Sequence, residues 1–100
     1  MHVISRKALR EFASVHPDSE APLDAWYRIA KKAEWENLVQ VREVYPHADP
    51  VGECTVFNIR GNRYRLICGI DYEGQVIYIR HVLTHKDYDR GGWKSGCESV

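Results

Sequence analysis

The sequence has few of the features that mark secreted, membrane-bound or metal-holding proteins. It has three cysteines in 100 residues, an odd number, and neither a long apolar run nor a signal peptide. Cys54, Cys68 and Cys97 also lack the close paired spacing of metal ligands. We therefore expect a protein of the reducing cytoplasm with no membrane segment and no cofactor. A Cys/His zinc site stays open as the alternative.

The sequence also lacks an excess of charge of either sign, because 14 Lys and Arg residues balance 14 Asp and Glu residues. Adhesion to nucleic acid through bulk charge is thereby disfavoured. The charge is unevenly placed, however, since residues 54–70 contain Arg60, Arg63 and Arg65 and no acidic residue. A focused anion site is consistent with this pattern. Walker loops, dinucleotide glycine fingerprints and G-x-S-x-G elbows are absent, so nucleotide hydrolysis and serine hydrolase chemistry have no support.

The first half of the chain has the apolar spacing of helices. We expect one helix over residues 5–15, with Ser5 as N-cap and Pro17 beyond its end. A second helix should start near Pro22. Its predicted inner stripe is Trp26, Ile29, Ala30 and Ala33. In this interpretation residues 35–44 form a less regular helical piece and residues 45–52 form a loop. Residues 1–4 form an edge strand.

From residue 54 the apolar period changes to two, which predicts strands. Turns at Gly61-Asn62 and near Gly74 give three consecutive antiparallel strands, the last over residues 76–83. In the implied register Phe57 lies opposite Leu66, and Leu66 lies opposite His81 on an apolar face. His81 is therefore interpreted as a structural histidine on the core side.

The opposite face of this sheet is predicted to be basic and open. Its members are Asn58, Arg60, Arg63, Arg65, Ile67, Tyr78, Arg80 and Val82. Arg60 lies across from Arg63, and such like-charge pairs cost on the order of a few tenths of a kcal/mol. A phosphate would offset that cost, because guanidinium groups match its geometry. Tyr78 and Asn58 add a stacking ring and an amide that suit RNA.

These patterns predict the fold class as α+β, with two N-terminal helices packed on one face of a small antiparallel sheet. Residues 1–100 are expected to form a single domain, with residues 91–100 as a flexible tail.

The segment that follows the last predicted strand holds the best candidate for proton transfer. His85 is accompanied by Lys86 and Tyr88, and imidazole suits proton transfer near neutral pH. Asp89 is a candidate for orienting His85 or Arg90. Two close carboxylates among several cations make a magnesium site improbable, so metal-free chemistry is expected. The remaining histidines, His2, His16 and His47, have no comparable neighbours in the sequence.

Two segments carry a resemblance to a known family. They read Val-Phe-Asn-Ile-x-Gly-Asn-x-Tyr-Arg-Leu-Ile at residues 56–67 and Tyr-Ile-Arg-x-Val-x-Thr-His-Lys-x-Tyr-Asp at residues 78–89. Together with Met-His-Val-Ile-Ser at residues 1–5 and Val-Tyr-Pro at residues 44–46, they resemble the HigB toxins of type II toxin-antitoxin systems. Related RelE-like nucleases often carry lysines on the early strands, whereas this chain has none between Lys32 and Lys86.

The resemblance implies a RelE-like fold and an endoribonuclease that cleaves messenger RNA on the ribosome. It also implies inhibition by a separate helix-turn-helix antitoxin, HigA, and contact with operator DNA only through the toxin-antitoxin complex.

We expect cleavage by attack of the ribose 2′-hydroxyl on the adjacent phosphorus. His85 would be general acid or base, and Arg65 and Arg80 would stabilise the transition state. Tyr88 would stack on or orient the scissile nucleotide, or share proton transfer. The predicted RNA contacts are Asn58, Arg60, Arg63, Tyr78 and Lys86. Two alternatives stay open. One is a gyrase-poisoning toxin of the same fold, and the other is a non-catalytic RNA- or protein-binding module.

Overall fold

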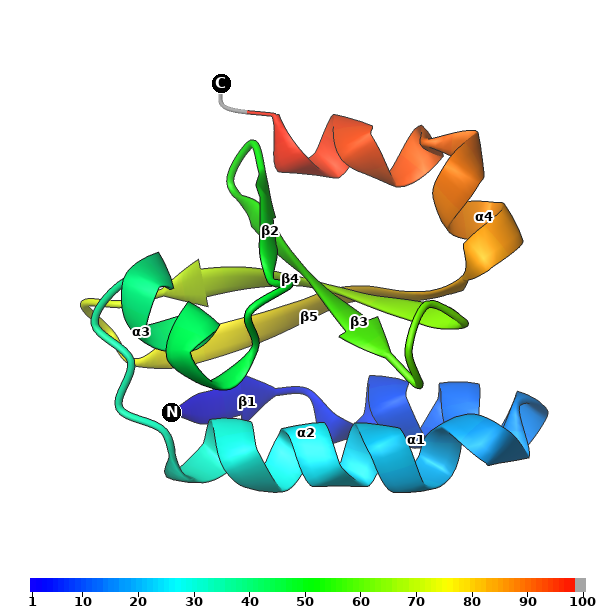
Figure 1. Ribbon diagram of the computed structural model, residues 1–100, viewed down its shortest axis with the longest axis horizontal. Coiled ribbons are helices and arrows are strands. Elements are labelled where there is room, and N and C mark those ends of the chain that lie inside the picture. Colours follow the sequence, from blue (N-terminus) through cyan, green and yellow to red (C-terminus); the bar gives the residue numbers. More distant parts are fainter. Residues whose placement is uncertain (99–100) are drawn as a thin grey trace.

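The computed structural model describes residues 1–98 and has an α+β order, in which a run of helices precedes a run of strands (Figure 1). The N-terminal part contains β1 (His2–Ile4), α1 (Arg6–Val15), the 3-10 helix η1 (Pro17–Ser19), α2 (Glu20–Lys32) and α3 (Leu38–Val44). The C-terminal part contains β2 (Asp49–Val51), β3 (Cys54–Ile59), β4 (Tyr64–Asp71), β5 (Val76–Thr84), α4 (His85–Arg90) and the 3-10 helix η2 (Gly92–Cys97). No helix of the described residues has the length and apolar character needed to cross a membrane.

The helices form close to where their sequence patterns predict them. Helix α1 ends at Val15, before Pro17, as expected. Helix α2 begins at Glu20, so Pro22 lies in its first turn, where the missing N–H costs no helical hydrogen bond. One member of the predicted stripe is wrong, because Ile29 is 41% exposed. Leu23 takes its place beside the other buried residues of α2.

The sheet has five strands in the order β1-β5-β4-β3-β2. The predicted antiparallel run of β3, β4 and β5 is confirmed. The sheet as a whole is mixed rather than antiparallel, because β1 lies parallel to β5 at one edge. A short β2 lies antiparallel to β3 at the other edge, inside the segment that we expected to be a loop. Helices packed on a sheet of this kind are compatible with a RelE-like fold.

A β-bulge overturns part of the predicted register. Strands β3 and β4 pair as expected, with Phe57 opposite Leu66, and β4 meets β5 as expected at Cys68 and Ile79. The pairing then shifts between Ile67 and Cys68, so that Leu66 lies opposite Val82 rather than His81. One extra residue exchanges the two faces of a strand.

The bulge therefore corrects two predictions. Val82 packs against the main core and does not belong to the basic face. His81 is exposed and pairs with Ile67, which belongs to the other face of the sheet, so its interpretation as a core histidine is wrong.

Helices α1 and α2 cover one face of the sheet and enclose the main core (Figure 1). Trp26 of α2 meets Phe57 of β3 edge to face, with ring centres 5.4 Å apart, and both side chains are about 1% exposed. Leu66 is fully buried in the same cluster. Burying a large apolar side chain stabilises a fold by about 1.5–3 kcal/mol, so this layer accounts for most of the apolar stabilisation.

The other face of the sheet, which we call the outer face, is partly covered and not open as predicted. Helices α4 and η2 cross above it (Figure 1). Trp93 and Cys97 of η2 form a second buried cluster there with Cys54, Val56 and Ile67. Residues 92–98 thus differ from the expected flexible tail, because η2 supplies apolar side chains to this cluster; residues 99–100 lie outside the described part.

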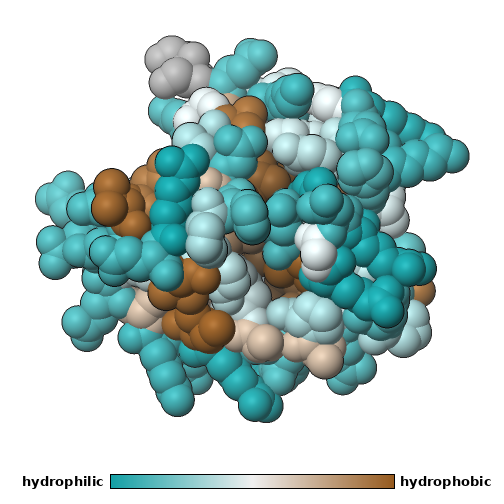
Figure 2. Space-filling model, in the orientation of Figure 1, coloured by the Kyte–Doolittle hydropathy of each residue, from teal (hydrophilic) through white to brown (hydrophobic). Residues whose placement is uncertain are grey.

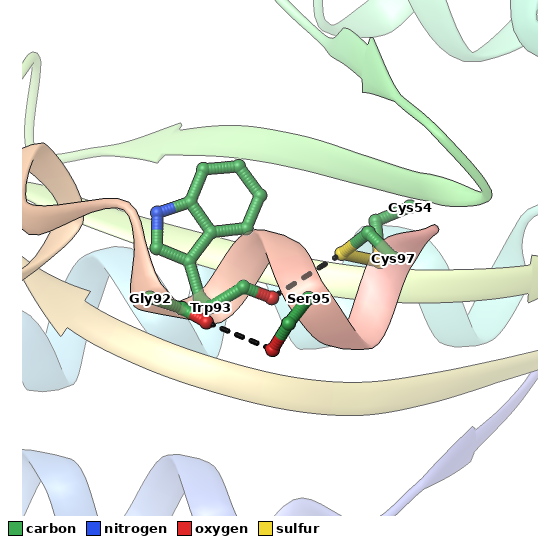
Figure 3. The surroundings of a disulfide bond; sticks show 5 residues. All are labelled: Cys54, Gly92, Trp93, Ser95 and Cys97. Atoms are coloured by element: carbon green, nitrogen blue, oxygen red, sulfur yellow. Dashed lines mark hydrogen bonds between the residues drawn. A yellow bond between two sulfur atoms is a disulfide. The ribbon is translucent and has the colours of Figure 1, made fainter. Parts of the chain in front are cut away.

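A disulfide between Cys54 and Cys97 attaches η2 to the start of β3 (Figure 3). The backbone N–H of Glu53 also donates to the carbonyl of Cys97 at 2.7 Å. Gly52 is required beside this contact, because a Cβ atom there would collide with the same carbonyl. The bond was not anticipated from the expected reducing environment, where disulfides are rare. Cys68 stays free, and burial raises the pKa of its thiol.

Candidate functional site

The most distinctive polar group of the outer face is the guanidinium of Arg65 on β4. Its side chain is only 8% exposed, which is unusual for arginine. One amino group donates to the carbonyl of Asn62 at 2.7 Å, in the turn between β3 and β4. No carboxylate within residues 1–98 lies at ion-pair distance from it. A nearly buried cation without an acidic partner favours binding of an anion from outside the chain.

The ring of Tyr88 on α4 packs against the Arg65 guanidinium. The guanidinium carbon lies 5.0 Å from the centre of the ring. The Trp93 ring stacks on Tyr88 at 4.9 Å and 15°, and its Nε1–H donates to the carbonyl of Tyr88 at 2.9 Å. The Arg65 guanidinium and the Trp93 ring cannot both occupy one face of the Tyr88 ring, so the Tyr88 ring lies between them. This leaves the phenol hydroxyl as the part of Tyr88 that can meet a ligand, and it excludes stacking of a base on the ring.

Arg65 and Tyr88 line a pocket of about 370 Å³ on the outer face. Asn58, which was predicted as a contact, lines it too. The rest of the polar wall was not predicted from the sequence, and it comes from the end of α3, the segment before β2 and the start of β2. Those residues are Arg42, His47 and Asp49. Only the pairing of β2 with β3, with Asp49 opposite Val56, brings this segment beside the predicted residues.

His85 begins α4 and lies one turn before Tyr88. Helix α4 starts here because the Thr84 side chain accepts from the N–H of Asp87 at 3.2 Å. The Nε2 atom of His85 lies 3.2 Å from Asp89, so of the two partners considered for that carboxylate it is His85 that Asp89 contacts. Arg90 pairs with Asp87 instead. His85 and Lys86 are exposed and do not line the Arg65 pocket, and the surface around α4 is hydrophilic (Figure 2).

Arg60 and Arg63 share an acidic partner, Asp18 of η1, which the sequence pattern did not indicate. Both guanidinium groups contact one oxygen of Asp18, at 2.8 and 3.1 Å, and Tyr64 donates to the other oxygen. The hydrogen bond from Tyr64, followed by the charges of Arg63 and Arg60, holds the pKa of Asp18 below its ordinary value. A carboxylate of the chain, rather than a bound phosphate, therefore offsets the repulsion between the two arginines. Two cations on one anion still leave this turn positively charged.

The remaining predicted residues lie on β5. Arg80 is exposed, and its guanidinium lies over Gly69, where an added Cβ would be 3.0 Å from Nε. Tyr78 is 44% exposed and pairs with Gly69. Neither residue lines the Arg65 pocket. His81 lines a separate pocket of about 410 Å³ with residues of α4 and η2.

A model of the HigB toxin family, described as the RelE-like toxic component of a toxin-antitoxin system, matches residues 19–91. The matched range contains every residue of the Arg65 pocket. The chain belongs to the HigB toxin family.

Relatives named as mRNA interferases match about nine-tenths of the chain. The mRNA interferase toxin HigB of Escherichia coli K12 is 34% identical over 92 residues, which are 89% of this chain and 88% of the relative. The mRNA interferase HigB of Shigella flexneri matches to the same extent. The mRNA interferase HigB of Escherichia coli O6:H1 is 26% identical over 90% of each chain. Membership of a toxin-antitoxin family implies an antitoxin as partner of this HigB-family chain.

Within residues 1–98, no three His, Cys, Asp or Glu side chains are grouped closely enough to hold a metal ion. The zinc alternative therefore has no ligand set in the described part of this HigB-family chain.

Proposed function

We propose that this chain is a toxin that cleaves messenger RNA, with Arg65 binding the phosphate at which the RNA is cut. The observation that carries the proposal is the nearly buried guanidinium of Arg65, which faces a pocket and has no carboxylate partner among the described residues. A guanidinium group can donate two parallel hydrogen bonds to the oxygens of one phosphate. The names of the relatives, mRNA interferases, support RNA as the source of that phosphate.

The reaction that suits these residues is attack of a ribose 2′-hydroxyl on the adjacent phosphorus. The 2′-oxygen–phosphorus bond forms, the bond from phosphorus to the 5′-oxygen breaks, and the products are a cyclic phosphate and a 5′-hydroxyl. The 2′-oxygen loses a proton and the 5′-oxygen gains one. Arg65 is proposed to neutralise the extra negative charge on the phosphorus oxygens in the transition state. Arg80 lies outside this pocket, over Gly69, and is proposed to bind a neighbouring phosphate of the same RNA. No step in this scheme uses a metal ion.

His85 is proposed as one of the two proton-transfer groups. Its contact with Asp89 fixes the ring, as a carboxylate commonly does for a catalytic imidazole. The hydroxyl of Tyr88 is proposed to orient the scissile nucleotide, since both faces of its ring are occupied.

The other predicted contacts are proposed to bind parts of the RNA on either side of the scissile phosphate. Asn58 is proposed to bind a base edge or sugar inside the pocket. The positive turn formed by Arg60 and Arg63 is proposed to contact flanking phosphates, together with Lys86. Tyr78 offers an exposed ring for a base farther along the strand.

The proposed setting is the cytoplasm, where the ribosome presents the message. The proposed inhibitor is a HigA-like helix-turn-helix antitoxin, and operator DNA would be contacted only by the complex of the two proteins. A neighbouring reading frame for such a small protein is expected if this is correct.

The purified chain tests the proposal in two parallel reactions. One contains a message on programmed ribosomes, and the other contains supercoiled DNA with gyrase. We expect cuts with 5′-hydroxyl ends in the message and intact DNA. DNA breaks without RNA cuts would instead identify a gyrase poison, and the absence of both would leave a binding module.

A further inference from the structure

The proposed reaction needs two proton transfers, and the pocket contains a histidine that has no role so far. This histidine, His47, lies in the segment between α3 and β2 and lines the same pocket as Arg65, Asn58 and Tyr88. His85 does not line that pocket. The inference that follows rests on the proposed function.

The segment that carries His47 is fixed on both sides. Before it, the Tyr45 ring packs edge to face on Phe57 in the core, with centres 5.4 Å apart. After it, Ala48 is 2% exposed, and its N–H donates to the carbonyl of Tyr45 at 3.0 Å. Arg42 donates from Nε to the carbonyl of Ala48, also at 3.0 Å. His47 itself is exposed, so an anchored backbone presents its ring to the pocket.

Three groups on the wall of the pocket can exchange protons, namely His47, Asp49 and the hydroxyl of Tyr88. Of these side-chain types, imidazole both gives and takes a proton most readily near neutral pH. We propose that His47 is a catalytic residue that exchanges a proton with the 2′- or 5′-oxygen of the RNA phosphodiester bound by Arg65. His47 in the pocket would then be one proton-transfer group, and His85, on α4 outside the pocket, would be the other.

The test is single-turnover cleavage of a message on programmed ribosomes by His47→Ala and His47→Gln. His2→Ala is the matched control, because His2 is an exposed histidine on β1, at the edge of the sheet farthest from β2. Binding is measured separately with a message whose 2′-hydroxyl at the cleavage site is replaced by hydrogen. Thermal unfolding of each variant checks that the fold is kept.

We expect both His47 variants to bind the uncleavable message as the unaltered chain does and to cut roughly a hundred- to ten-thousand-fold more slowly. Added imidazole should restore part of the rate of His47→Ala and leave His2→Ala unchanged, which a purely structural role would not produce.

Cleavage by His47→Ala at the unaltered rate would overturn the inference while leaving the proposed function intact. Parallel loss of binding and cleavage, without rescue by imidazole, would also overturn it and make His47 a docking residue. An unaltered chain that cuts no message would instead contradict the proposed function itself.

Discussion

At the scale of single residues, the shape of the Arg65 guanidinium matters as much as its charge. One edge is held by the carbonyl of Asn62 and one face by the Tyr88 ring. Lysine keeps the charge but has no planar group to fill this position. We expect Arg65→Lys to lower single-turnover cleavage on the order of a hundred- to a thousand-fold, as does loss of one transition-state donor elsewhere. Arg28→Lys is the control, since Arg28 is 75% exposed on α2. Equal rates for the two variants would contradict the role of Arg65.

The carboxylate of Asp18 should make the free energy of unfolding depend on pH. Its pKa is depressed in the folded chain, chiefly by the hydrogen bond from Tyr64, so its contribution is fully present above the unfolded value near 3.8. That contribution is lost as the pH falls through the lower folded value. Asp18→Asn should therefore destabilise the chain at neutral pH, and the difference from the unaltered chain should shrink in acid. Urea unfolding of both chains at neutral and at acidic pH measures the difference in their free energies of unfolding. A difference that is the same at both pH values would contradict the prediction.

Residue patterns predicted some of the site and missed the rest for a physical reason. Asn58, Arg65 and Tyr88 were predicted and meet in the pocket, because strand alternation and a short connection fix their placement. His47 was passed over, because β2 is three residues long and includes a proline. Such a strand gives no periodic signal, and its pairing with β3 depends on tertiary contacts.

At the scale of elements, the bulge in β5 predicts the effect of changing His81. Because the bulge places His81 on the outer face, where it is exposed, His81→Ala should change the free energy of unfolding by no more than about 0.5 kcal/mol. Leu66, which would face His81 only without the bulge, is fully buried in the core, and Leu66→Ala should cost about 2–5 kcal/mol. Urea unfolding of both variants compares the two positions. A loss for His81→Ala as large as that for Leu66→Ala would favour the unbulged register.

The attachment of η2 to β3 gives a second prediction at this scale. The disulfide closes a span of 43 residues that includes β3, β4, β5 and α4. Cys97→Ser, or reduction of the bond, should lower the free energy of unfolding by about 2–4 kcal/mol. Trp93 is only 6% exposed in the folded chain, so release of η2 should shift its fluorescence toward that of an exposed indole. Because Trp93 supports the ring that holds Arg65, cleavage should fall as well. The comparison is Cys97→Ser with and without reductant, since reductant should destabilise the unaltered chain and leave Cys97→Ser unchanged. An unaltered chain whose stability does not respond to reductant would contradict the attachment.

At the scale of the whole molecule, the order of helices and strands was predictable from apolar periodicity, whereas the closure of the outer face was not. The helical spacing of α1 and α2 identifies their buried sides before any tertiary contact is known. Strand β3 is buried on both faces, so its alternation predicts a strand but not the cover over its outer face. The parallel pairing of β1 and the packing of η2 join residues far apart in the sequence. The pocket around Arg65 depends on another such contact, because the pairing of β2 with β3 brings His47 and Asp49 beside Arg65.

The most direct measurement of the central claim is a map of RNA ends in cells that express either the unaltered chain or Arg65→Ala at equal level. With the unaltered chain we predict new 5′-hydroxyl ends inside translated messages, together with arrested growth. With Arg65→Ala we predict that these ends disappear while the folded protein persists. New ends of equal abundance with Arg65→Ala, or arrested growth without any new RNA ends, would contradict cleavage of messenger RNA at this pocket.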